Sequence, residues 1–321
     1  MIRNYATGLN HIDWKSVEYN FCLPELPWVT GREMAGVVEA VGSEVTGFQR
    51  GDRVWTSTYY KDRRAGCFQD LVVVSQHTIC PIPSNLDFAA AACLGVGGLT
   101  AAMSLWRWLD VPMYPPAEVK QQEQRPESTD DASETDCILI WGGSTVTGQF
   151  AIQLAAHAGL DVIAVCSSRT EEIVRMLKPK HVVTYTGKTD EELVEEIRAL
   201  GQKRISKAID LVGPQTSKLV LDVISEDGEE VVVNFAPLAF MSSKQQVPDN
   251  ARVHNVEMKQ FVLDERSEVY ARRLNELVES GAVVMPKLRV MEGGLAVVEE
   301  GLRRLRKGDL AGEKLVVSFS A

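Results

Sequence analysis

The chain has 321 residues, of which 45% are apolar, and a formal net charge of −10 at pH 7. This length and apolar content predict a large buried core divided between two domains. The negative charge argues against general binding to nucleic acid or to a membrane, and the six cysteines form no C-x-x-C pair typical of a zinc cage. We expect no apolar run of membrane-spanning length and no secretory leader, so the predicted location is cytoplasmic.

The first hundred residues alternate valine-rich runs with glycine turns, most clearly at residues 36–42, 48–54 and 71–74. Such alternation is typical of a small β-barrel. A helix is expected at residues 99–109. The segment that follows, residues 111–136, is dense in Pro, Glu, Gln and Ser and is expected to be a disordered surface insertion.

Beyond this insertion, apolar strand patterns alternate with helical patterns. The expected strands lie at residues 138–141, 161–165, 182–185, 208–212, 230–235 and 256–263. This rhythm predicts a doubly wound parallel sheet, and hence an α/β fold class with a Rossmann domain.

The C-terminal segment is expected to return to the barrel. It contains predicted helices near residues 268–280 and 294–307 and a last strand at 314–319. The predicted domains are therefore a barrel-like catalytic and substrate domain, residues 1–97 with 264–321, and a cofactor-binding domain, residues 98–263.

A glycine-rich turn follows the first strand of the predicted Rossmann domain, where the sequence reads Trp-Gly-Gly-Ser-Thr-Val-Thr-Gly before a helix. A turn of this kind permits close packing of strand and helix and directs free N–H groups at a dinucleotide pyrophosphate. Thr145 stands at the central glycine position of the motif, so the pattern is degenerate. The predicted cofactor-binding residues are Gly142, Gly143, Ser144, Thr145, Val146, Thr147 and Gly148.

The end of the next strand indicates which dinucleotide is bound. Cys166 stands where NAD enzymes place an acidic residue for the ribose hydroxyls, and Ser167, Ser168 and Arg169 follow it. Two hydroxyls and a guanidinium suit a 2′-phosphate, so the predicted cofactor is NADP(H). Tyr185, after the third strand, is a further candidate that would cover the adenosine ribose phosphate. A solvated arginine in a loop is the plainer interpretation of Arg169.

These motifs, in this order, resemble the medium-chain dehydrogenase/reductase superfamily, in which a chaperonin-10-like barrel is joined to a Rossmann domain. The resemblance rests on the glycines of residues 36–54, on Gly-Val-Gly-Gly-Leu-Thr-Ala-Ala at 95–102, and on the cofactor turn. Within that superfamily the chain is most similar to the trans-acting enoyl reductases of fungal polyketide pathways. Asn-His-Ile-Asp-Trp-Lys at 10–15, the sequence at 141–148 and the Pro-rich insertion carry this narrower resemblance.

The resemblance also bears on metal binding. The positions of the catalytic ligands in the zinc alcohol dehydrogenases of the superfamily correspond to Asn10, Arg32 and Val96. Arginine and valine supply no lone pair that zinc accepts, so a zinc-free enzyme with no metal site is predicted. Glu33 is interpreted as one partner of an ion pair with the neighbouring arginine rather than as a metal carboxylate.

The resemblance implies roles for individual residues. Lys15 lies where relatives place a polar proton-relay residue, and Thr100 matches a threonine that faces the nicotinamide. These two are the predicted catalytic residues, although a surface lysine and a helix cap are the plainer interpretations. Asn234 and Phe235 belong to the end of the fifth Rossmann strand, where their backbone would hold the nicotinamide carboxamide.

Together these inferences predict an NADPH-dependent enoyl reductase that reduces the α,β double bond of a carrier-bound polyketide. Its partner would be a polyketide synthase, or a synthase–peptide synthetase hybrid, and the contact would be made through the acyl carrier protein. The enzyme is expected to be a monomer. Residues 303–307, with Lys287 and Arg289, are the densest basic cluster for that contact, and a solvated helix face explains this cluster equally well. A zinc-free quinone or alkenal reductase acting on free small molecules is an alternative. Relatives usually begin with further barrel strands, so either the sequence is truncated there or part of the reductase pocket has been lost. The second alternative keeps open a non-redox cyclase or partner protein derived from an enoyl reductase.

Overall fold

The computed structural model describes residues 1–60, 62–115, 136–201, 204–225, 232–308 and 310–319. The chain forms two compact units, Met1–Thr100 with Glu257–Ala321 (unit 1) and Ala101–Val256 (unit 2). The sequence predicted divisions after residue 97 and before residue 264. The expected disorder of the Pro-rich insertion falls mainly on residues 116–135, which lie outside the described residues.

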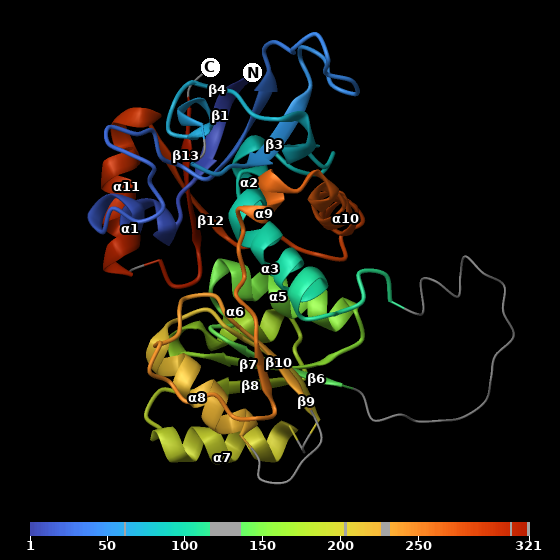
Figure 1. Ribbon diagram of the computed structural model, residues 1–321, viewed down its shortest axis with the longest axis vertical. Coiled ribbons are helices and arrows are strands. Elements are labelled where there is room, and N and C mark those ends of the chain that lie inside the picture. The colour runs from blue at the N-terminus through green and yellow to red at the C-terminus, as the bar shows by residue number, and fades with distance from the viewer. Residues whose placement is uncertain (61, 116–135, 202–203, 226–231, 309, 320–321) are drawn as a thin grey trace, which may run out of the picture. The chain divides into compact units, whose positions relative to one another are not determined.

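Among the described residues of unit 1, seven strands form one sheet in the order β12-β13-β1-β2-β3-β5, with β4 paired to β1. Their bounds are β1 (Ile2–Gly8), β2 (Glu33–Val38), β3 (Arg53–Ser57), β4 (Leu71–Val72), β5 (Ile79–Pro81), β12 (Leu288–Glu292) and β13 (Lys314–Ser318). The pairings are antiparallel except that of β12 with β13. Because β13 pairs with β1, the two ends of the chain meet in this sheet, which confirms the predicted return of the C-terminal segment (Figure 1).

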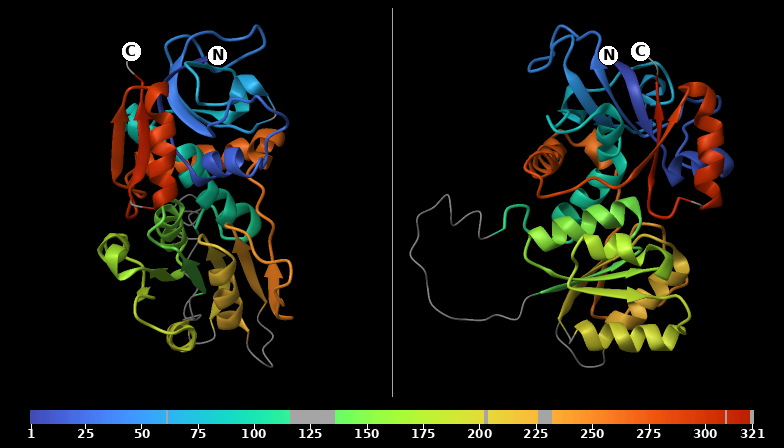
Figure 2. Two further views of the ribbon diagram at one scale, coloured as in Figure 1. Left: turned by 90° about the vertical axis from the view of Figure 1, so that its left-hand side faces the viewer. Right: turned by 180° about the vertical axis from the view of Figure 1, so that it is seen from behind.

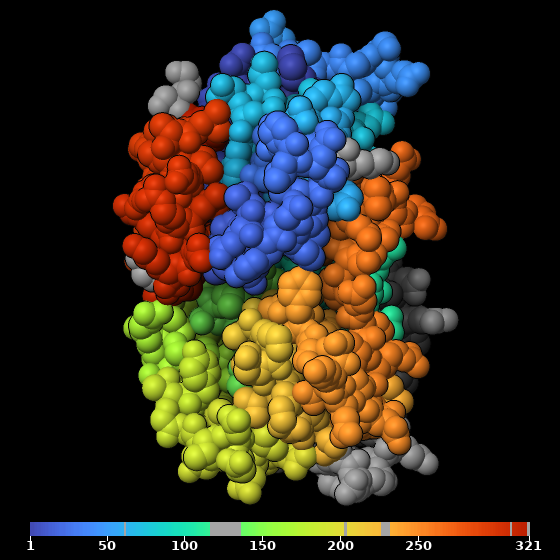
Figure 3. Space-filling model, turned by 60° about the vertical axis from the view of Figure 1, so that its left-hand side comes forward, coloured from blue at the N-terminus to red at the C-terminus, as the bar shows by residue number. Residues whose placement is uncertain are grey.

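The helices of unit 1 lie around this sheet. They are α1 (His11–Glu18), α2 (Phe88–Ala91), α9 (Gln260–Leu263), α10 (Glu268–Glu279) and α11 (Leu295–Lys307), with single turns at Arg63–Ala65, Gln76–Thr78 and Glu265–Ser267. The helices predicted near 268–280 and 294–307 are confirmed. Helix α11 lies beside α1, where Arg306 forms an ion pair with Glu18, and Figure 3 shows both at the surface of unit 1.

Helix α2 begins a longer helical segment, Phe88–Trp108. It contains a π-helical turn at Leu94–Gly98, helix α3 (Leu99–Met103) and a second π-helical turn at Ser104–Trp108. The segment is long and apolar enough to cross a membrane, but 72% of its most apolar window is buried inside the protein. The expectation that no run reaches this length is therefore wrong for this segment, and its burial is typical of a core helix.

Unit 2 is built on six described strands in the order β11-β10-β9-β6-β7-β8, all parallel. The strands are β6 (Cys137–Trp141), β7 (Asp161–Cys166), β8 (His181–Thr184), β9 (Ile205–Asp210), β10 (Val233–Pro237) and β11 (Ala251–Val253). Counted from β6, this is the strand order 3-2-1-4-5-6 of the doubly wound dinucleotide-binding fold, which confirms the predicted fold class.

Helices cover both faces of this second sheet. They are α5 (Val146–His157), α6 (Glu171–Met176), α7 (Asp190–Gly201) and α8 (Pro214–Ile224), with a single turn at Ser168–Thr170. Helices α7 and α8 pack together on one face, and α5 lies on the other (Figure 2). The core between the sheet and α7–α8 is apolar, with Leu139, Phe235 and Val220 among its members.

Three predicted strands differ from the structure. The strand expected at residues 256–263 is wrong, because Gln260–Leu263 forms helix α9 and Phe261 is its buried contact. The sixth strand is instead the short edge strand Ala251–Val253. The strands predicted at 208–212 and 230–235 exist, but they are shifted along the chain to Ile205–Asp210 and Val233–Pro237.

Candidate functional site

The glycine turn between β6 and α5 has the tight geometry that the sequence predicted. Gly142 has a φ of +89°, a conformation that L side chains rarely adopt. The N–H groups of Gly142 and Gly143 both donate to the carbonyl of Val165 on β7, at 3.0 and 2.9 Å. The turn is thereby fixed to the neighbouring strand before the helix begins.

Helix α5 begins with a side-chain cap. Thr145 lies at the N-cap, and its hydroxyl accepts a hydrogen bond from the N–H of Gly148 at 3.0 Å. A Cβ added at Gly148 would lie 2.3 Å from the carbonyl oxygen of Gly142, so only glycine permits this approach of helix to turn. The N–H groups of Val146 and Thr147 stand in the first helical turn, where amides have no intrahelical acceptor. This cradle of donors and glycines fits a dinucleotide phosphate.

The cofactor turn lies at the point where the strand order reverses, between β6 and β9. Asp210, the last residue of β9, accepts hydrogen bonds from the N–H groups of Val212 and Gly213 and from the hydroxyl of Ser217, at 3.1, 3.3 and 2.6 Å. Burial raises the pKa of Asp210, while these donors favour its charged form. They hold the loop so that Val212 stands within 3.0 Å of a Cβ built on Gly142.

The segment after β7 contains the residues that the sequence predicted to meet the cofactor ribose. Cys166 is buried, and desolvation raises the pKa of its thiol to about 11, so it is neutral at pH 7. Ser167 hydrogen-bonds Thr170 at 2.9 Å, whereas Ser168 and Arg169 are exposed. Tyr185, directly after β8, is 43% exposed, and its N–H donates to the carbonyl of Cys166 at 3.1 Å.

The structure places Asn234 and Phe235 inside β10 rather than at its end. The side chain of Asn234 hydrogen-bonds His254 at 2.8 Å, and Phe235 is fully buried with its carbonyl bound to the N–H of His254. The carboxyl end of the strand is Pro237. A role for Asn234 and Phe235 in holding a carboxamide stays a prediction, and their backbone already takes part in the sheet.

Lys15 lies on α1 in unit 1, together with two aromatic neighbours. Its ammonium stands 5.7 Å from the centre of the Trp14 ring, and the indole N–H of Trp14 donates to Nδ1 of His11 at 3.1 Å. Desolvation and the positive charges of Lys15 and Lys314 lower the pKa of His11 to about 4. The imidazole is therefore neutral at pH 7, and with Nδ1 as acceptor its proton resides on Nε2.

Thr100 lies within α3, inside the helical segment that begins at Phe88, and is half-buried. It does not occupy a helix cap, so the plainer interpretation of this residue is wrong. The π-helical turn Leu94–Gly98 directly precedes its helix. Turns of this type occur frequently at functional sites.

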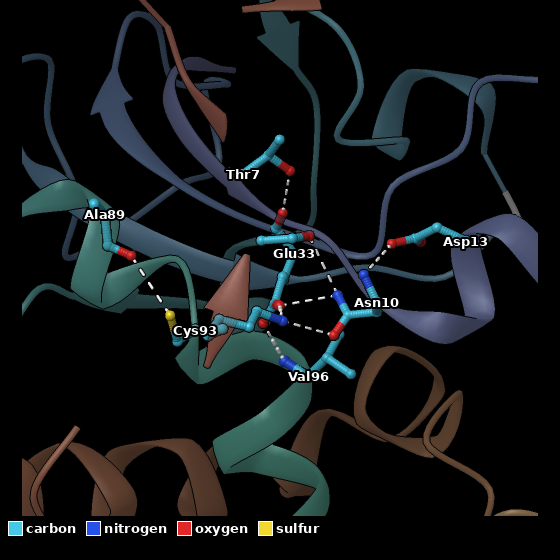
Figure 4. Close-up of polar contacts among 9 residues, drawn as sticks. Thr7, Asn10, Asp13, Glu33, Ala89, Cys93 and Val96 are labelled. Atoms are coloured by element: carbon cyan, nitrogen blue, oxygen red, sulfur yellow. Dashed lines mark hydrogen bonds and ion pairs between the residues drawn. The ribbon is translucent and has the colours of Figure 1, made fainter. Parts of the chain in front are cut away.

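Glu33 is the centre of a buried polar cluster at the start of β2. One carboxylate oxygen accepts hydrogen bonds from the side-chain amide of Asn10, at 2.9 Å, and from the ammonium of Lys314. The other oxygen accepts the N–H of Val96 at 2.5 Å (Figure 4). Lys314 also donates to the side-chain oxygen of Asn10 at 2.7 Å. Glu33 thus forms the expected ion pair, but with Lys314 rather than with Arg32.

A second buried carboxylate, Asp13, lies next to this cluster on α1. It accepts the N–H of Asn10 at 2.8 Å and the hydroxyl of Tyr60 at 3.1 Å. Burial raises its pKa to about 7, against the opposing effects of Lys314 and Arg32. The guanidinium of Arg32 lies 4.9 Å from the centre of the Tyr60 ring. Asp13 therefore titrates near neutral pH.

These side chains do not fit a zinc ion. Of the three residues that correspond to zinc ligands, Arg32 is a cation packed on Tyr60, and Val96 offers only its amide to Glu33. Lys314 already occupies the carboxylate oxygen that would face a cation. Within the described ranges, no three His, Cys, Asp or Glu side chains are grouped as metal ligands.

Two family models match the chain, that of the alcohol dehydrogenase GroES-like domain over residues 1–84 and that of the zinc-binding dehydrogenases over residues 147–278. Together with a strand order typical of dinucleotide binding and a glycine turn at its switch point, they define a two-domain dehydrogenase. The chain belongs to the medium-chain dehydrogenase/reductase superfamily and is an oxidoreductase of that class. Its Rossmann-type unit implies a nicotinamide cofactor.

Among curated relatives, the chain is 28% identical to trans-enoyl reductase himH of Aspergillus japonicus, over 100% of this chain and 89% of that protein. It is also 28% identical to trans-enoyl reductase resD of Aspergillus sclerotiorum, over 98% and 91%. Among solved structures, the CurK enoyl reductase aligns with a TM-score of 0.77 and 18% identity, covering 99% of this chain and 90% of that chain. A quinone oxidoreductase of Pseudomonas syringae pv. Tomato DC3000 aligns with a TM-score of 0.76 and 22% identity, with the same coverage. These two structures establish similarity of fold.

Sequence reasoning missed two residues of the buried cluster, Lys314 and Asp13. The signal for Lys314 was a single lysine directly before the apolar run of the last strand, a position from which its ammonium points inward. Asp13 stands between Ile12 and Trp14, and nothing in this local sequence indicates whether its carboxylate is buried or solvated. Its burial arises from contact with Tyr60, 47 residues away along the chain.

Proposed function

We propose that the chain is an NADPH-dependent enoyl reductase that reduces the α,β double bond of an acyl thioester carried by a partner polyketide synthase. The observation that carries the proposal is the glycine turn of unit 2 followed, at the ribose position, by a neutral buried thiol and an exposed arginine. The names of the curated relatives support the reaction.

The preference for NADPH rests on charge at the end of β7. A carboxylate at Cys166 would repel a 2′-phosphate, but this thiol is buried and uncharged. Arg169 is exposed two residues further on in the single turn Ser168–Thr170, and among the described residues no ion pair neutralises it. A guanidinium that is not already paired can bind a phosphate by charge-assisted hydrogen bonds.

Replacement of Arg169 tests this preference. We expect Arg169→Ala to weaken NADPH binding by roughly 10- to 100-fold, the equivalent of one hydrogen bond to a charged group, and to leave NADH binding unchanged. Arg175→Ala is the matched control, because Arg175 is an exposed arginine of the same region that is already paired with Glu171. Equal losses for both cofactors, or none for NADPH, would overturn the assignment.

The proposed chemistry depends on the substrate C=C bond, which accepts hydride because it is conjugated to the thioester carbonyl. The glycine turn of unit 2 would hold a reduced nicotinamide dinucleotide, which would supply hydride for the β-carbon of the unsaturated thioester. Lys15 donates a hydrogen bond to the thioester oxygen, on which negative charge develops, and provides a proton for the α-carbon. His11 stays neutral beside Lys15, so Lys15 is the cation on α1 that can face that oxygen. Thr100 orients the substrate or the nicotinamide ring.

Zinc independence is part of this proposal. Reduction of a simple carbonyl to an alcohol calls for strong polarisation of the oxygen, which zinc supplies in related dehydrogenases. Arg32, Val96 and the Glu33–Lys314 pair offer no ligand set for such an ion. Conjugate reduction spreads the developing charge over an enolate and is compatible with a lysine donor.

Turnover separates this function from its alternatives. The oxidation of NADPH is followed with four substrates. Two are a short α,β-unsaturated acyl thioester of pantetheine and the same thioester on an acyl carrier protein, and the other two are a free quinone and a free alkenal. We expect the carrier-bound thioester to be reduced with the highest kcat/KM, and Lys15→Met to lower kcat by about 100-fold. Lys307→Met, at the exposed end of α11, is the control. Faster reduction of free quinone or alkenal would overturn the carrier-bound assignment, and no oxidation of NADPH would overturn the reductase.

The basic cluster formed by residues 303–307, Lys287 and Arg289 has less unpaired positive charge than the sequence suggests. Arg303 and Arg304 pair with glutamates one turn earlier on α11, and Arg306 pairs with Glu18. Lys287 and Arg289 share Glu313. A docking role for this cluster stays a prediction. Reversal of charge at Arg303 and Arg304 is expected to lower kcat/KM for the carrier-bound substrate and not for the pantetheine thioester. Unchanged turnover of the carrier-bound substrate would eliminate the docking role.

A further inference from the structure

A buried ion pair in unit 1 is not accounted for by the chemistry proposed above. Glu33 has no exposed surface, and the side chain of Lys314 is 3% exposed. The two residues are 281 positions apart in the sequence, at the first residues of β2 and β13. The pair therefore joins two strands of the sheet from within.

The backbone is shaped to enclose this pair. A Cβ added at Gly8 would lie 2.3 Å from a carboxylate oxygen of Glu33, and one added at Gly95 would lie 2.8 Å from Cβ of Glu33. Two glycines thus bring β1 and the π-helical turn against the same side chain. The Glu33 side chain thus meets main chain at its carboxylate and at its Cβ, and its two oxygens accept hydrogen bonds from Lys314, Asn10 and Val96.

The contacts of the pair lead to both candidate catalytic residues. Asn10 is the N-cap of α1, the helix that carries Lys15. Val96 lies in the π-helical turn directly before the helix that carries Thr100. Because the N–H of Val96 donates to Glu33 instead of to a carbonyl of its own helix, the carboxylate takes part in the widened turn.

Stability alone does not account for such a pair. Buried ion pairs can often be replaced by apolar residues of similar volume without loss of stability, because removing two charges from water offsets most of their attraction. An apolar replacement cannot form the four hydrogen bonds that join Glu33, Lys314, Asn10 and Val96 in one geometry. A role in fixing geometry therefore remains.

We propose that Glu33 and Lys314 are positioning residues that fix the start of α1 and the π-helical turn, and thereby set the places of Lys15 and Thr100. This inference rests on the proposed function for the consequence in catalysis, but not for its structural part. The pair does not touch the substrate. It acts through Asn10 on one side and through Val96 on the other.

The experiment compares the wild-type protein with Glu33→Gln/Lys314→Met, which removes both charges together, and with the conservative Lys314→Arg. Lys314→Met alone would leave Glu33 buried without its cation and is expected to destabilise the fold strongly, so the double variant is the main test. Val317→Ala, a core substitution on the same strand, is the control for general loss of stability. Amide hydrogen exchange, NADPH binding and kcat are measured on each folded protein.

For the double variant we expect exchange to become at least about tenfold faster at the Val96 amide and through α1, with β3 unchanged. We expect kcat to fall by about 100-fold, KM to change little and NADPH affinity to be retained, because misplaced catalytic groups affect turnover first. The single variant Lys314→Arg, which keeps the cation, should retain most of the wild-type kcat. Val317→Ala should retain kcat.

Other outcomes overturn the inference. Exchange that stays unchanged at Val96 and α1, or that rises equally throughout unit 1, would show that the pair fixes no local geometry. Retained kcat in the double variant would remove its role in catalysis. A wild-type protein that reduces no thioester would instead refute the proposed function, while the exchange pattern would still decide whether the pair positions α1 and the π-helical turn.

Discussion

The buried carboxyl of Asp13 predicts an unusual dependence of stability on pH. Its pKa is about 7 in the folded chain, against 3.8 for a free aspartate, with burial as the main cause. A group whose folded pKa is raised contributes stability that is fully present below its unfolded pKa and is lost as the pH rises through the folded pKa. The difference corresponds to about 4 kcal/mol, lost at up to ~1.4 kcal/mol per pH unit between pH 4 and pH 7.

Asp13→Asn isolates this contribution. The amide retains an oxygen for the N–H of Asn10 and can donate to the hydroxyl of Tyr60, so both contacts have a partner at every pH. We expect the variant to be less stable than, or similar to, the wild-type protein at pH 5 and more stable at pH 8. The free energy of unfolding is measured by urea denaturation across this range.

A control variant removes the effect of net charge. Glu25→Gln deletes a carboxylate that is 66% exposed on the same unit, and its difference from the wild-type protein should stay small at each pH. If the difference between Asp13→Asn and the wild-type protein is also constant from pH 5 to pH 8, Asp13 is ionised throughout. Lys314 and Arg32 would then outweigh burial, and the reasoning would be refuted.

Three further predictions concern unit 2. Gly148→Ala should lower the free energy of unfolding by roughly 1–3 kcal/mol and weaken cofactor binding, because its Cβ would press on the carbonyl of Gly142; a urea curve and a fluorescence titration with NADPH measure both, and unchanged values would contradict the packing. Thr145→Ala should lower the free energy of unfolding by about 1 kcal/mol through loss of the N-cap, whereas Thr145→Ser should retain it, and equal urea midpoints would argue against the cap. Asp210→Asn should lower the free energy of unfolding by roughly 1–3 kcal/mol, because the amide nitrogen would face one of the N–H or hydroxyl groups that now donate to the carboxylate. A urea midpoint equal to that of the wild-type protein would show that the loop does not need the charge.

The parts of the fold that sequence reasoning identified are those with strong local signals. Strands β6 and β7 are continuous apolar runs, and Gly142 and Gly148 occupy positions where a side chain has no room. The geometry of the glycine turn could therefore be predicted from the sequence, whereas its binding of a cofactor stays a prediction. Thr145, which appeared to weaken the motif, is the N-cap of α5, so its hydroxyl has a local role that a glycine would lack.

The errors in the fold arise where a short pattern fits two periods. Residues 256–263 contain several apolar side chains, which suggested a strand, but Met258, Phe261 and Val262 also follow the spacing of one helical face. The structure adopts the helical solution and buries Phe261. The true sixth strand, Ala251–Val253, is too short for its alternation to be distinguished from a loop.

The candidate catalytic region could be predicted less fully, because its chemistry depends on contacts between distant segments. Lys15 and Thr100 were found through a family resemblance, each within a short motif. Lys314 forms its key contact 281 residues from its own position, and no local pattern encodes that distance. The sequence did indicate that Glu33 belongs to an ion pair. Proximity along the chain suggested Arg32 as its partner, which is wrong, because the partner is Lys314.

Under the proposed function, the polar cluster of unit 1 and Lys15 would divide two roles that a catalytic zinc ion combines in zinc-dependent dehydrogenases. Such an ion organises its ligands and also polarises the substrate oxygen. Here the Glu33–Lys314 pair has the means to organise, since its contacts reach Asn10 and Val96. It cannot polarise a substrate, because the ammonium is enclosed by protein acceptors. Under the proposed function, the half-buried Lys15 would supply the polarisation, and a lysine donor suits an enolate oxygen, whose charge is already shared with carbon.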